Sequence, residues 1–373
     1  MSMMSMQSAP KSVDELPTPA LVIDGVVVRR NIERLASYTT GHGLRIRPHA
    51  KTHKSRFIAR LQMAAGAIGL AVAKVGEAEQ LQESAEDLLM AYPAVDVSRC
   101  TRLAALARTR TMRVAAENPS GVACLGAAAV QAGSTIGVLV EIDVGMGRTG
   151  VATPEDALKL AQLITQTSGL RLDGILCYPG QLWNPVAEQP RVLAVVSAKL
   201  QETLDLWRAN GLEAKIVSGG TTPTIFNSHL VKQYTEIRPG TYVFNDMNTF
   251  RGGYCKLEEC AARLICTVIS TTVKNQVVLD GGTKTFSSDL CLPARDSGHG
   301  YMLEYPAARV AVLSEEHAQI DVSQCENRPR AGERVSVVPN HICPCINLQD
   351  SVWWREADGS LQKINIDARG QLS

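Results

Sequence analysis

The residue best suited to covalent chemistry is Lys51, which lies in the segment RPHAKTHK. The apolar pattern predicts a β-strand over 44–51 that ends at Lys51, close to His49, His53 and Lys54. Neighbouring cations and partial burial lower the pKa of a lysine, and such an amine can form a Schiff base with a carbonyl compound. Most lysines are instead solvated surface residues. Position and basic neighbours therefore single out Lys51.

A second candidate is the segment SGGTTPT, which begins at Ser218. Gly219 and Gly220 would let successive backbone N–H groups approach an anion, and the hydroxyl of Thr221 adds a donor. The alternative interpretation is an ordinary glycine turn, because glycines and hydroxyl residues are common in turns. The segment alone leaves both open.

A third candidate is the pair His341 and Cys343 in PNHICPCINLQD. In an extended segment, side chains two positions apart point to the same face. Imidazole and thiolate favour zinc, and two ligands leave the open positions of a catalytic site. The alternative is a core cysteine beside an incidental histidine. We interpret Cys345 as a packing residue rather than a further ligand, and His317 in SEEHA as a candidate catalytic residue near the metal.

These candidates fall among short β-type runs that alternate with helical segments. Eight alternations predict a (β/α)8 barrel preceded by a helix from about Val26 to Tyr38, and a doubly wound open sheet is the alternative. Functional residues of a barrel lie at the carboxyl ends of its strands, which adds Arg148, Tyr178 and Tyr242. The eight runs are 44–51, 67–74, 87–92, 112–116, 135–143, 172–178, 214–220 and 234–240.

Beyond about Cys255 the pattern changes to strands separated by turn residues, with few helical segments. We expect residues 18–254 to form the barrel and residues 255–373 to form a smaller C-terminal β domain that carries the metal site. Residues 1–17 and the early segment PALVID are expected to pack with this second domain.

The composition excludes several classes of protein. Of the 373 residues, 45% are hydrophobic and 20% are charged, which is typical of a globular chain rather than a disordered one. A net charge of +1 offers no general attraction to nucleic acid or to an anionic membrane. No signal peptide is recognisable, and the uncharged stretch 118–140 predicts a helix followed by a strand rather than a membrane span. Ten scattered cysteines then indicate reduced thiols in a soluble cytoplasmic protein.

Together these motifs resemble those of a known family. Over nearly its whole length the chain is similar to the D-threonine aldolase and D-serine dehydratase group, which are pyridoxal-phosphate enzymes of the alanine-racemase class, fold type III. The fold implied is a (β/α)8 barrel followed by a β domain. The motifs that carry the resemblance are RPHAKTHK, EIDVGMGRTG, SGGTTPT, RPGTYVFND, VLDGGTK, LSEEH and PNHICP.

The resemblance implies a role for each candidate residue. Lys51 would carry pyridoxal 5′-phosphate as a Schiff base, and Arg148 and Tyr178 would contact the pyridine ring, with Tyr178 near its nitrogen. His341 and Cys343 would bind a divalent metal. The cofactor phosphate would be held by Tyr242 and by the backbone of Ser218, Gly219, Gly220 and Thr221.

The metal motif also separates the branches of this family. The aldolases resemble one another in a histidine-x-aspartate pair that tolerates manganese or magnesium, whereas dehydratases of D-serine and D-threo-3-hydroxyaspartate have histidine-x-cysteine with zinc or a related ion. The HIC of this chain favours a dehydratase, which removes water from a D-3-hydroxy amino acid and yields a 2-oxo acid and ammonia. The resemblance also implies a homodimer.

Other functions stay open. A retro-aldol cleavage would use the same residues to give glycine and an aldehyde. A racemase would need a second base, usually a tyrosine of a partner subunit, and would not need the His-x-Cys pair. A non-catalytic cofactor carrier of this fold would lack residues 256–373, and a zinc-stabilised binding module would leave Lys51 and the SGGTT loop without a role.

Overall fold

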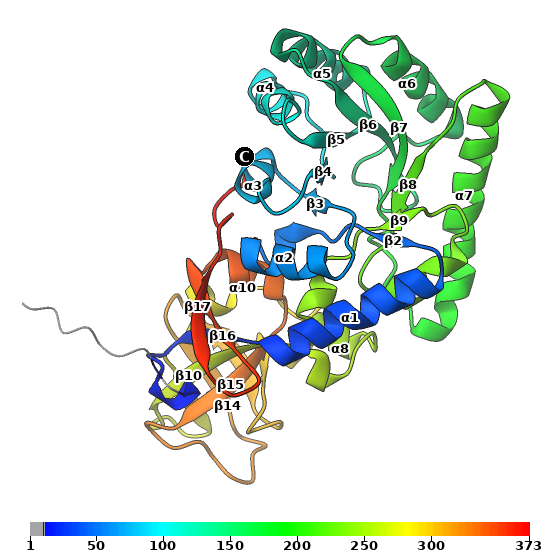
Figure 1. The fold of residues 1–373 in the computed structure, drawn as a ribbon. Helices are drawn as coiled ribbons and strands as arrows, with labels where there is room; N and C mark the ends of the chain where they lie inside the picture. Colours follow the sequence, from blue (N-terminus) through cyan, green and yellow to red (C-terminus); the bar gives the residue numbers. More distant parts are fainter. Residues whose placement is uncertain (1–9, 11) are drawn as a thin grey trace, which may run out of the picture. The chain divides into compact units, whose positions relative to one another are not determined.

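The computed structural model describes residues 10 and 12–373, which form two compact units (Figure 1). One unit contains the N-terminal segment through Asn31 with 243–251 and 255–366, and the other contains 32–242, 252–254 and 367–373. The predicted boundary near 254 is close to the observed division, but residues 18–31 and 243–251, predicted in the barrel, belong to the other unit, and residues 367–373 belong to the barrel unit. The prediction that residues 1–17 pack with the second domain includes residues 1–9 and 11, which lie outside the described residues.

Eight parallel strands form one sheet, in the order β2-β9-β8-β7-β6-β5-β4-β3. Backbone N–H groups of Ile68 and Ala71 donate to the carbonyls of Ile46 and Pro48, each at 2.9 Å, and close the sheet between β2 and β3. The predicted barrel is therefore confirmed, and every strand overlaps one of the predicted runs. The strands are β2 (Arg45–Ile46), β3 (Leu70–Val72), β4 (Asp87–Met90), β5 (Thr111–Ala116), β6 (Ile136–Ile142), β7 (Leu170–Cys177), β8 (Ile216–Gly219) and β9 (Glu236–Ile237).

The helices that begin at Val97, Pro119 and Pro154 each have a side-chain N-cap. The Thr153 hydroxyl accepts a hydrogen bond from the backbone N–H of Asp156 at 3.1 Å, and Pro154 opens the helix, as predicted. The stretch 118–140 is a helix followed by a strand, and no helix of the described residues is long and apolar enough to cross a membrane. The longer helices are α1 (Gly25–Gly41), α2 (Arg56–Ala64), α3 (Val75–Leu81), α4 (Val97–Leu106), α5 (Pro119–Ala132), α6 (Pro154–Gln166) and α7 (Gln189–Ala209).

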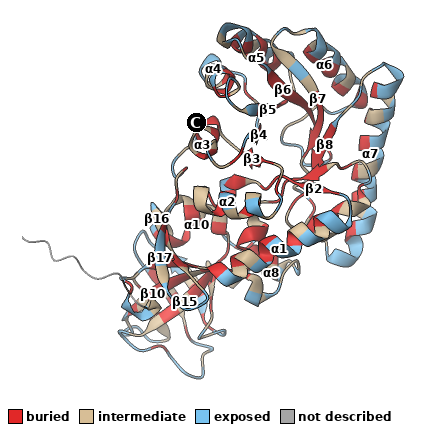
Figure 2. Cartoon of the chain, in the orientation of Figure 1, coloured by how far each residue is buried: buried red, intermediate tan, exposed pale blue. Residues whose placement is uncertain are grey.

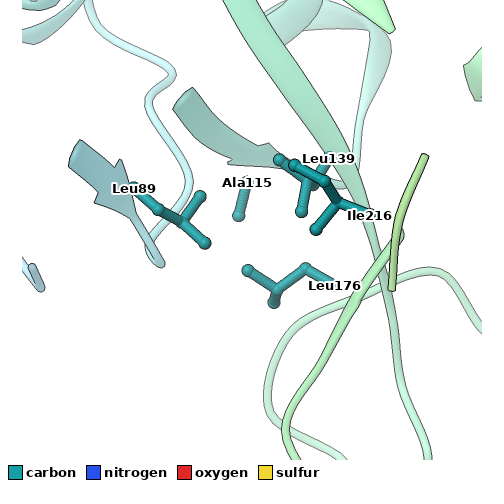
Figure 3. Packing of buried hydrophobic residues seen from close by; sticks show 5 residues of the cluster. All are labelled: Leu89, Ala115, Leu139, Leu176 and Ile216. Atoms are coloured by element: carbon teal, nitrogen blue, oxygen red, sulfur yellow. The ribbon is translucent and has the colours of Figure 1, made fainter. Parts of the chain in front are cut away.

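One layer of the barrel interior is apolar. It contains one side chain from each of the neighbouring strands β4 to β8, and these side chains converge (Figure 3). All seven residues of β6 are buried, and Figure 2 shows the same for most of this sheet. Burying each large aliphatic side chain contributes roughly 1.5–3 kcal/mol. The layer consists of Leu89, Ala115, Leu139, Leu176 and Ile216.

A second group of barrel side chains is charged. The buried guanidinium of Arg47 donates from Nε to Glu236 Oε1 at 2.9 Å and from Nη1 to Asp87 Oδ1 at 2.6 Å. Arg113 bonds both Asp87 and Asp173. Burial alone would raise the pKa of Glu236, but Arg47 beside it lowers that pKa below its ordinary value. Each of these buried charges has a partner of opposite sign on another strand, so the ion pairs link several strands of the barrel.

We expect Glu236→Gln to lower the free energy of unfolding by about 3–5 kcal/mol at neutral pH, because it leaves Arg47 buried without its carboxylate. The lowered pKa means that Glu236 stabilises the fold above its unfolded pKa of about 4.3, and that this contribution is lost as the pH falls through the folded pKa. Urea denaturation of both proteins across this pH range measures the effect. Glu315→Gln, at an exposed carboxylate, is the control, and a variant difference that does not shrink at low pH contradicts the prediction.

The other unit holds a mostly antiparallel sheet, in the order β13-β14-β11-β10-β1-β16-β17, with β15 pairing β10 and β12. β1 (Ala20–Asp24), part of PALVID, pairs with β10 and β16 and so belongs to this sheet, as expected. Leu16 is buried against Ala20, Val22 and Ile265. The remaining elements are β10 (Ala262–Ser270), β11 (Gln276–Leu279), β12 (Gly300–Met302), β13 (Arg309–Leu313), β14 (Ala318–Asp321), β15 (Arg334–Pro339), β16 (Ser351–Arg355), β17 (Leu361–Asn365), α8 (Met247–Arg251), α9 (Thr283–Phe286) and α10 (Ile342–Asn347).

Candidate active site

A pocket of about 430 Å³ lies at the carboxyl ends of the barrel strands. Its lining includes Lys51, Arg148 and Tyr178, so three residues predicted from separate strands share one cavity. Leu176, which lines the pocket, belongs to the apolar layer, and Ala91, another lining residue, packs against that layer. The apolar layer therefore forms the floor of the pocket. The other lining residues are His49, Ala73, Lys74, Tyr92, Pro93, Glu141, Thr149 and Arg238.

Lys51 lies in the 3-10 turn η2 (Ala50–Thr52), after β2, with an exposed side chain. Its neighbour His49 lines the same pocket. Burial, followed by the charges of Lys51 and Arg238, lowers the pKa of His49 well below its ordinary value. The imidazole is therefore neutral at pH 7 and adds no positive charge beside Lys51.

The other basic neighbours of Lys51 are likewise not free cations. Burial lowers the pKa of His53 to about 4, and its Nδ1 accepts a hydrogen bond from the backbone N–H of Ser55 at 3.1 Å. Lys54 is buried and pairs with Glu77 at 3.3 Å. The prediction of a crowded cationic cluster is wrong, because desolvation neutralises the imidazoles and an ion pair takes Lys54.

Arg148 reaches the pocket from the glycine-rich loop after β6. Its guanidinium carbon lies 4.8 Å from the centroid of the Tyr178 ring, so the two side chains predicted to contact a pyridine ring contact each other. Three backbone N–H groups of the loop donate to Asp143 Oδ1 at 2.9–3.0 Å and fix its course. A side chain at Gly150 would collide with the backbone at Asp143, which explains a glycine there.

Three charged residues of the pocket, Arg238, Glu141 and Lys74, were missed by the sequence analysis. Arg238, after β9, is buried and donates to Ser218 Oγ at 2.6 Å and to the Cys177 carbonyl at 2.8 Å. Glu141, at the end of β6, accepts a hydrogen bond from Thr149 at 2.7 Å through Oε1, and burial raises its pKa. All three are charged residues inside apolar strand runs, and that is the signal that could have identified them.

The predicted phosphate segment begins with the last two residues of β8, at the same end of the barrel as the pocket, but it is not in the pocket lining. The Ser218 hydroxyl donates to Glu236 at 2.6 Å and accepts from Arg238, so this side chain is committed to the protein interior. Gly220 has a φ of +80°, and Thr221 Oγ1 lies 3.1 Å from Thr224 Oγ1. The Ser218 side chain is therefore not available for an anion, and the backbone of the segment is.

Tyr242 is also outside the pocket lining. It is buried, and its hydroxyl accepts a hydrogen bond from Gln62 Nε2 at 3.0 Å. Burial raises the pKa of Tyr242, so that it stays a neutral phenol. A neutral phenol can donate a hydrogen bond to an anion without repelling it.

The structure supplies a separate reason for Gly219. A Cβ there would lie 2.2 Å from Cε1 of the buried Tyr234 ring. We expect Gly219→Ala to lower the free energy of unfolding by about 1–3 kcal/mol through overpacking, as urea denaturation would show. Gly211→Ala, where a Cβ meets open space but φ is +72°, isolates backbone strain as the control. Unchanged stability in Gly219→Ala contradicts the role of Tyr234.

The pocket fits a polar aromatic cofactor such as pyridoxal phosphate. Glu141 Oε2 and His49 Nδ1 are buried polar atoms without a hydrogen-bond partner among the described residues. Buried polar atoms are normally paired, so two such atoms in one pocket indicate a polar ligand. The adjacent amine of Lys51 and the ring of Tyr178 supply a covalent anchor and an aromatic wall.

The predicted metal ligands lie at the start of α10, and the segment is not extended as the sequence analysis assumed. His341 caps the helix and Cys343 is in its first turn, because Pro344 suits a first turn and Asp246 Oδ2 accepts the backbone N–H of Ile342 at 3.1 Å. The two side chains still meet: burial opposes protonation of His341, but a hydrogen bond with Cys343 helps to raise its pKa to about 10.

An imidazole and a thiol in contact are a donor set that fits zinc. His341 Nδ1 also lies 2.7 Å from Asp289 Oδ2, an oxygen that orients the ring. Among the described residues no group of three or more His, Cys, Asp or Glu side chains is arranged to hold a metal, so a bound ion would keep positions open for other ligands.

Two further sequence candidates fall outside this pair. Cys345 is buried and donates to the Phe286 carbonyl at 2.7 Å, which makes it a packing residue, as interpreted. His317 is exposed in the turn between β13 and β14, and its side chain makes no hydrogen bond or ion pair within the described part of the chain. The structure does not bring His317 together with His341 and Cys343.

Two family models match the chain. "Alanine racemase, N-terminal domain" matches residues 23–248, and "Putative serine dehydratase domain" matches residues 261–354. The matches cover the barrel and most of the β domain. Together they span the segments that carry Lys51, Arg148, Tyr178, His341 and Cys343.

Individual proteins match over nearly the full length. The chain is 30% identical to a D-threonine aldolase of Arthrobacter sp. over 95% of its own length and 93% of the relative's. It is 29% identical to D-threo-3-hydroxyaspartate dehydratase of Delftia sp. (strain HT23), over 93% and 96% of the two chains. The crystal structure of D-threonine aldolase from Filomicrobium marinum superposes with a TM-score of 0.91 at 29% identity, covering 98% of this chain and 100% of that one.

Proposed function

Because the chain belongs to the alanine-racemase-like family of D-threonine aldolases and D-serine dehydratases, we propose that it is a pyridoxal-phosphate- and metal-dependent lyase of D-3-hydroxy amino acids. The reaction we favour is loss of water, which yields a 2-oxo acid and ammonia. The observation that carries this proposal is one pocket lined by Lys51, Arg148 and Tyr178. The same pocket is lined by Glu141 and His49, whose buried Oε2 and Nδ1 atoms have no hydrogen-bond partner among the described residues.

Residues of the pocket and of the neighbouring strand ends would hold the cofactor. Lys51 would bind it covalently, Arg148 and Tyr178 would lie against its ring, and Tyr242 with the backbone of 218–221 would take the phosphate. When bound, pyridoxal phosphate withdraws electrons from bonds at the substrate α carbon. The Lys51 amine, once released by the substrate, would accept the α proton at Nζ.

His341 and Cys343 would hold the metal, with zinc favoured by the nitrogen and sulfur donors and manganese or magnesium as alternatives. A divalent ion with open positions supplies a Lewis acid for a departing hydroxyl. Asp289 would keep the His341 ring oriented. The His-x-Cys pair is what favours elimination over aldol cleavage.

Retro-aldol cleavage is the second candidate, since an aldolase of Arthrobacter sp. matches the chain over nearly its full length. Product analysis decides between them: the purified enzyme with pyridoxal phosphate and zinc is given D-serine, D-threonine and D-threo-3-hydroxyaspartate. A 2-oxo acid with ammonia supports the dehydratase, and glycine with an aldehyde supports the aldolase. Only the L-enantiomer as product would contradict both and indicate a racemase.

We also propose a homodimer, which follows from the resemblance, and a cytoplasmic location, which is supported by ten free cysteines. Analytical ultracentrifugation tests the first. Fractionation of the source cells tests the second.

A further inference from the structure

The turn that carries Lys51 ends at a residue with an unusual backbone. Lys54 has a φ of +51°, in the left-handed region that residues with a Cβ rarely adopt. Its backbone N–H donates to the Ala50 carbonyl at 2.8 Å, which closes the turn around Lys51. Strained residues of this kind persist only where their surroundings hold them, and they cluster at functional sites. The contacts of Lys54 therefore identify what holds this turn.

The side chain of Lys54 makes the first of these contacts. It points into the interior with 5% of its surface exposed, and its Nζ lies 3.3 Å from Oε1 of Glu77, whose side chain is 2% exposed. The contact is an ion pair only, since Nζ has no hydrogen-bond partner among the described residues. A buried charge requires an opposite charge beside it, so Glu77 is what allows Lys54 to point inward.

Glu77 also holds the end of the neighbouring strand. Its other carboxylate oxygen, Oε2, accepts the backbone N–H of Ala73 at 2.7 Å, and Ala73 lines the active-site pocket. The backbone of β3 is paired with the segment before Lys51 as well, because the Ala71 N–H donates to the Pro48 carbonyl at 2.9 Å. One buried carboxylate of α3 therefore ties together two parts of the pocket wall, the Lys51 turn and the end of β3.

The segment after β17 holds the same turn from another element. Ala368 is buried, and its backbone N–H donates to the Lys54 carbonyl at 2.9 Å. Asp367 Oδ2 accepts the backbone N–H of Arg56, at the start of α2, at 2.7 Å. Figure 1 shows this end of the chain beside α3. Both the side chain and the backbone of Lys54 are therefore fixed.

Lys51 itself has no such contacts. Its side chain is exposed in the pocket, and among residues 10 and 12–373 it makes no hydrogen bond or ion pair. The position of its amine therefore depends on the turn. A buried ion pair adds little to stability when compared with an apolar pair of similar volume. Stability of the barrel alone therefore does not account for Lys54 and Glu77.

We propose that Lys54 and Glu77 are positioning residues for Lys51, because their buried ion pair fixes the turn that presents the Lys51 amine to the pocket. The inference rests on the proposed function, in which Lys51 carries the cofactor, and adds the residues that hold this lysine in place. In that step the Lys51 nitrogen bonds to the aldehyde carbon of pyridoxal phosphate, and the aldehyde oxygen leaves as water. A displacement of about 1 Å between reacting groups can cost about 10²-fold in rate.

The rate of Schiff-base formation tests the proposal. Pyridoxal phosphate is added to the cofactor-free enzyme, and the reaction is followed by absorbance and by borohydride labelling of the peptide that contains Lys51. The variant combines Lys54→Met with Glu77→Gln, which removes both charges, keeps both volumes and keeps an acceptor for the Ala73 N–H. We expect urea denaturation to give nearly wild-type stability, and the Schiff base to form about 10- to 100-fold more slowly.

The matched control is Glu79→Gln, on the same helix, where the carboxylate pairs with Arg102 at 2.6 Å and both side chains are about one-third exposed. It should form the Schiff base at the wild-type rate. A double variant that reacts at the wild-type rate overturns the proposal. So does one that fails to fold, or whose loss of stability accounts for its loss of rate, because the pair would then serve the barrel as a whole.

Hydrogen exchange separates this proposal from the lyase function, since it needs no cofactor. In the double variant we expect faster backbone exchange in residues 50–56 and unchanged exchange in the other barrel strands. If the wild type forms no Schiff base at Lys51, the proposed function fails, and exchange still decides whether the pair fixes the turn. If the wild type is labelled at Lys51 but the double variant shows neither slower labelling nor faster exchange, the positioning role fails alone.

Discussion

Lys51→Ala should lower turnover at least about 10⁴-fold, because it removes both the covalent anchor of the cofactor and the base for the α proton. Steady-state rates with saturating pyridoxal phosphate measure the loss. In the wild type, borohydride reduction should fix the cofactor to the peptide that contains Lys51, as mass spectrometry would show. The variant should no longer be labelled.

The matched control is Lys159→Ala, at an exposed lysine of α6 that pairs with Asp156. It should keep both labelling and rate. Labelling at another lysine, or a Lys51→Ala enzyme with full turnover, would remove Lys51 from the site. Circular dichroism distinguishes loss of chemistry from loss of fold, and little loss of fold is expected because the Lys51 side chain is exposed.

The barrel could be predicted because its signals are local. Each strand is a short apolar run. The start of the helix after Thr153 is indicated by a capping hydroxyl followed by Pro154. Lys51, Arg148 and Tyr178 were predicted to meet because all three follow strands, and the closed strand order brings strand ends to one mouth. The sheet order itself comes from pairing between distant segments, which periodicity does not display.

The electrostatics of the site could not be predicted in the same way. His49 and His53 look cationic beside Lys51 in sequence, but burial makes both imidazoles neutral. Arg238 and Glu141 escaped notice because a buried charge in a strand run resembles an exposed one until the fold is known. Gly219 was attributed to anion binding, whereas the structure shows that the Tyr234 ring alone already requires a glycine.

The structure brings the side chains of His341 and Cys343 together, but through a backbone conformation different from the one predicted. The sequence analysis placed the pair together by the two-residue repeat of an extended chain. The structure instead brings them together at the first turn of α10, where the His341 backbone is still extended and Cys343 has entered the helix. Side chains two positions apart at a helix start can therefore converge, as alternate side chains in a strand do.

Removing the metal should lower release of 2-oxo acid about 10³-fold, since a Lewis acid contributes several kcal/mol to a charged transition state. Cofactor binding should persist, because the ligands proposed for the metal and those proposed for the cofactor are different residues in different units. Chelation, and separately Cys343→Ala, test this by rate, metal content and cofactor absorbance. Zinc should restore the chelated wild type but not the variant.

Cys325→Ala is the control for loss of a half-exposed thiol and should keep both metal and rate. Cys343→Asp replaces the thiolate by the oxygen donor that the resemblance associates with aldolases, so it should raise the ratio of glycine to 2-oxo acid. An unchanged ratio in a metal-loaded variant would mean that the ligand type does not steer the reaction. Full turnover in protein shown to be free of metal would contradict the metal's role altogether, and exchange of the α proton without product would then favour racemisation.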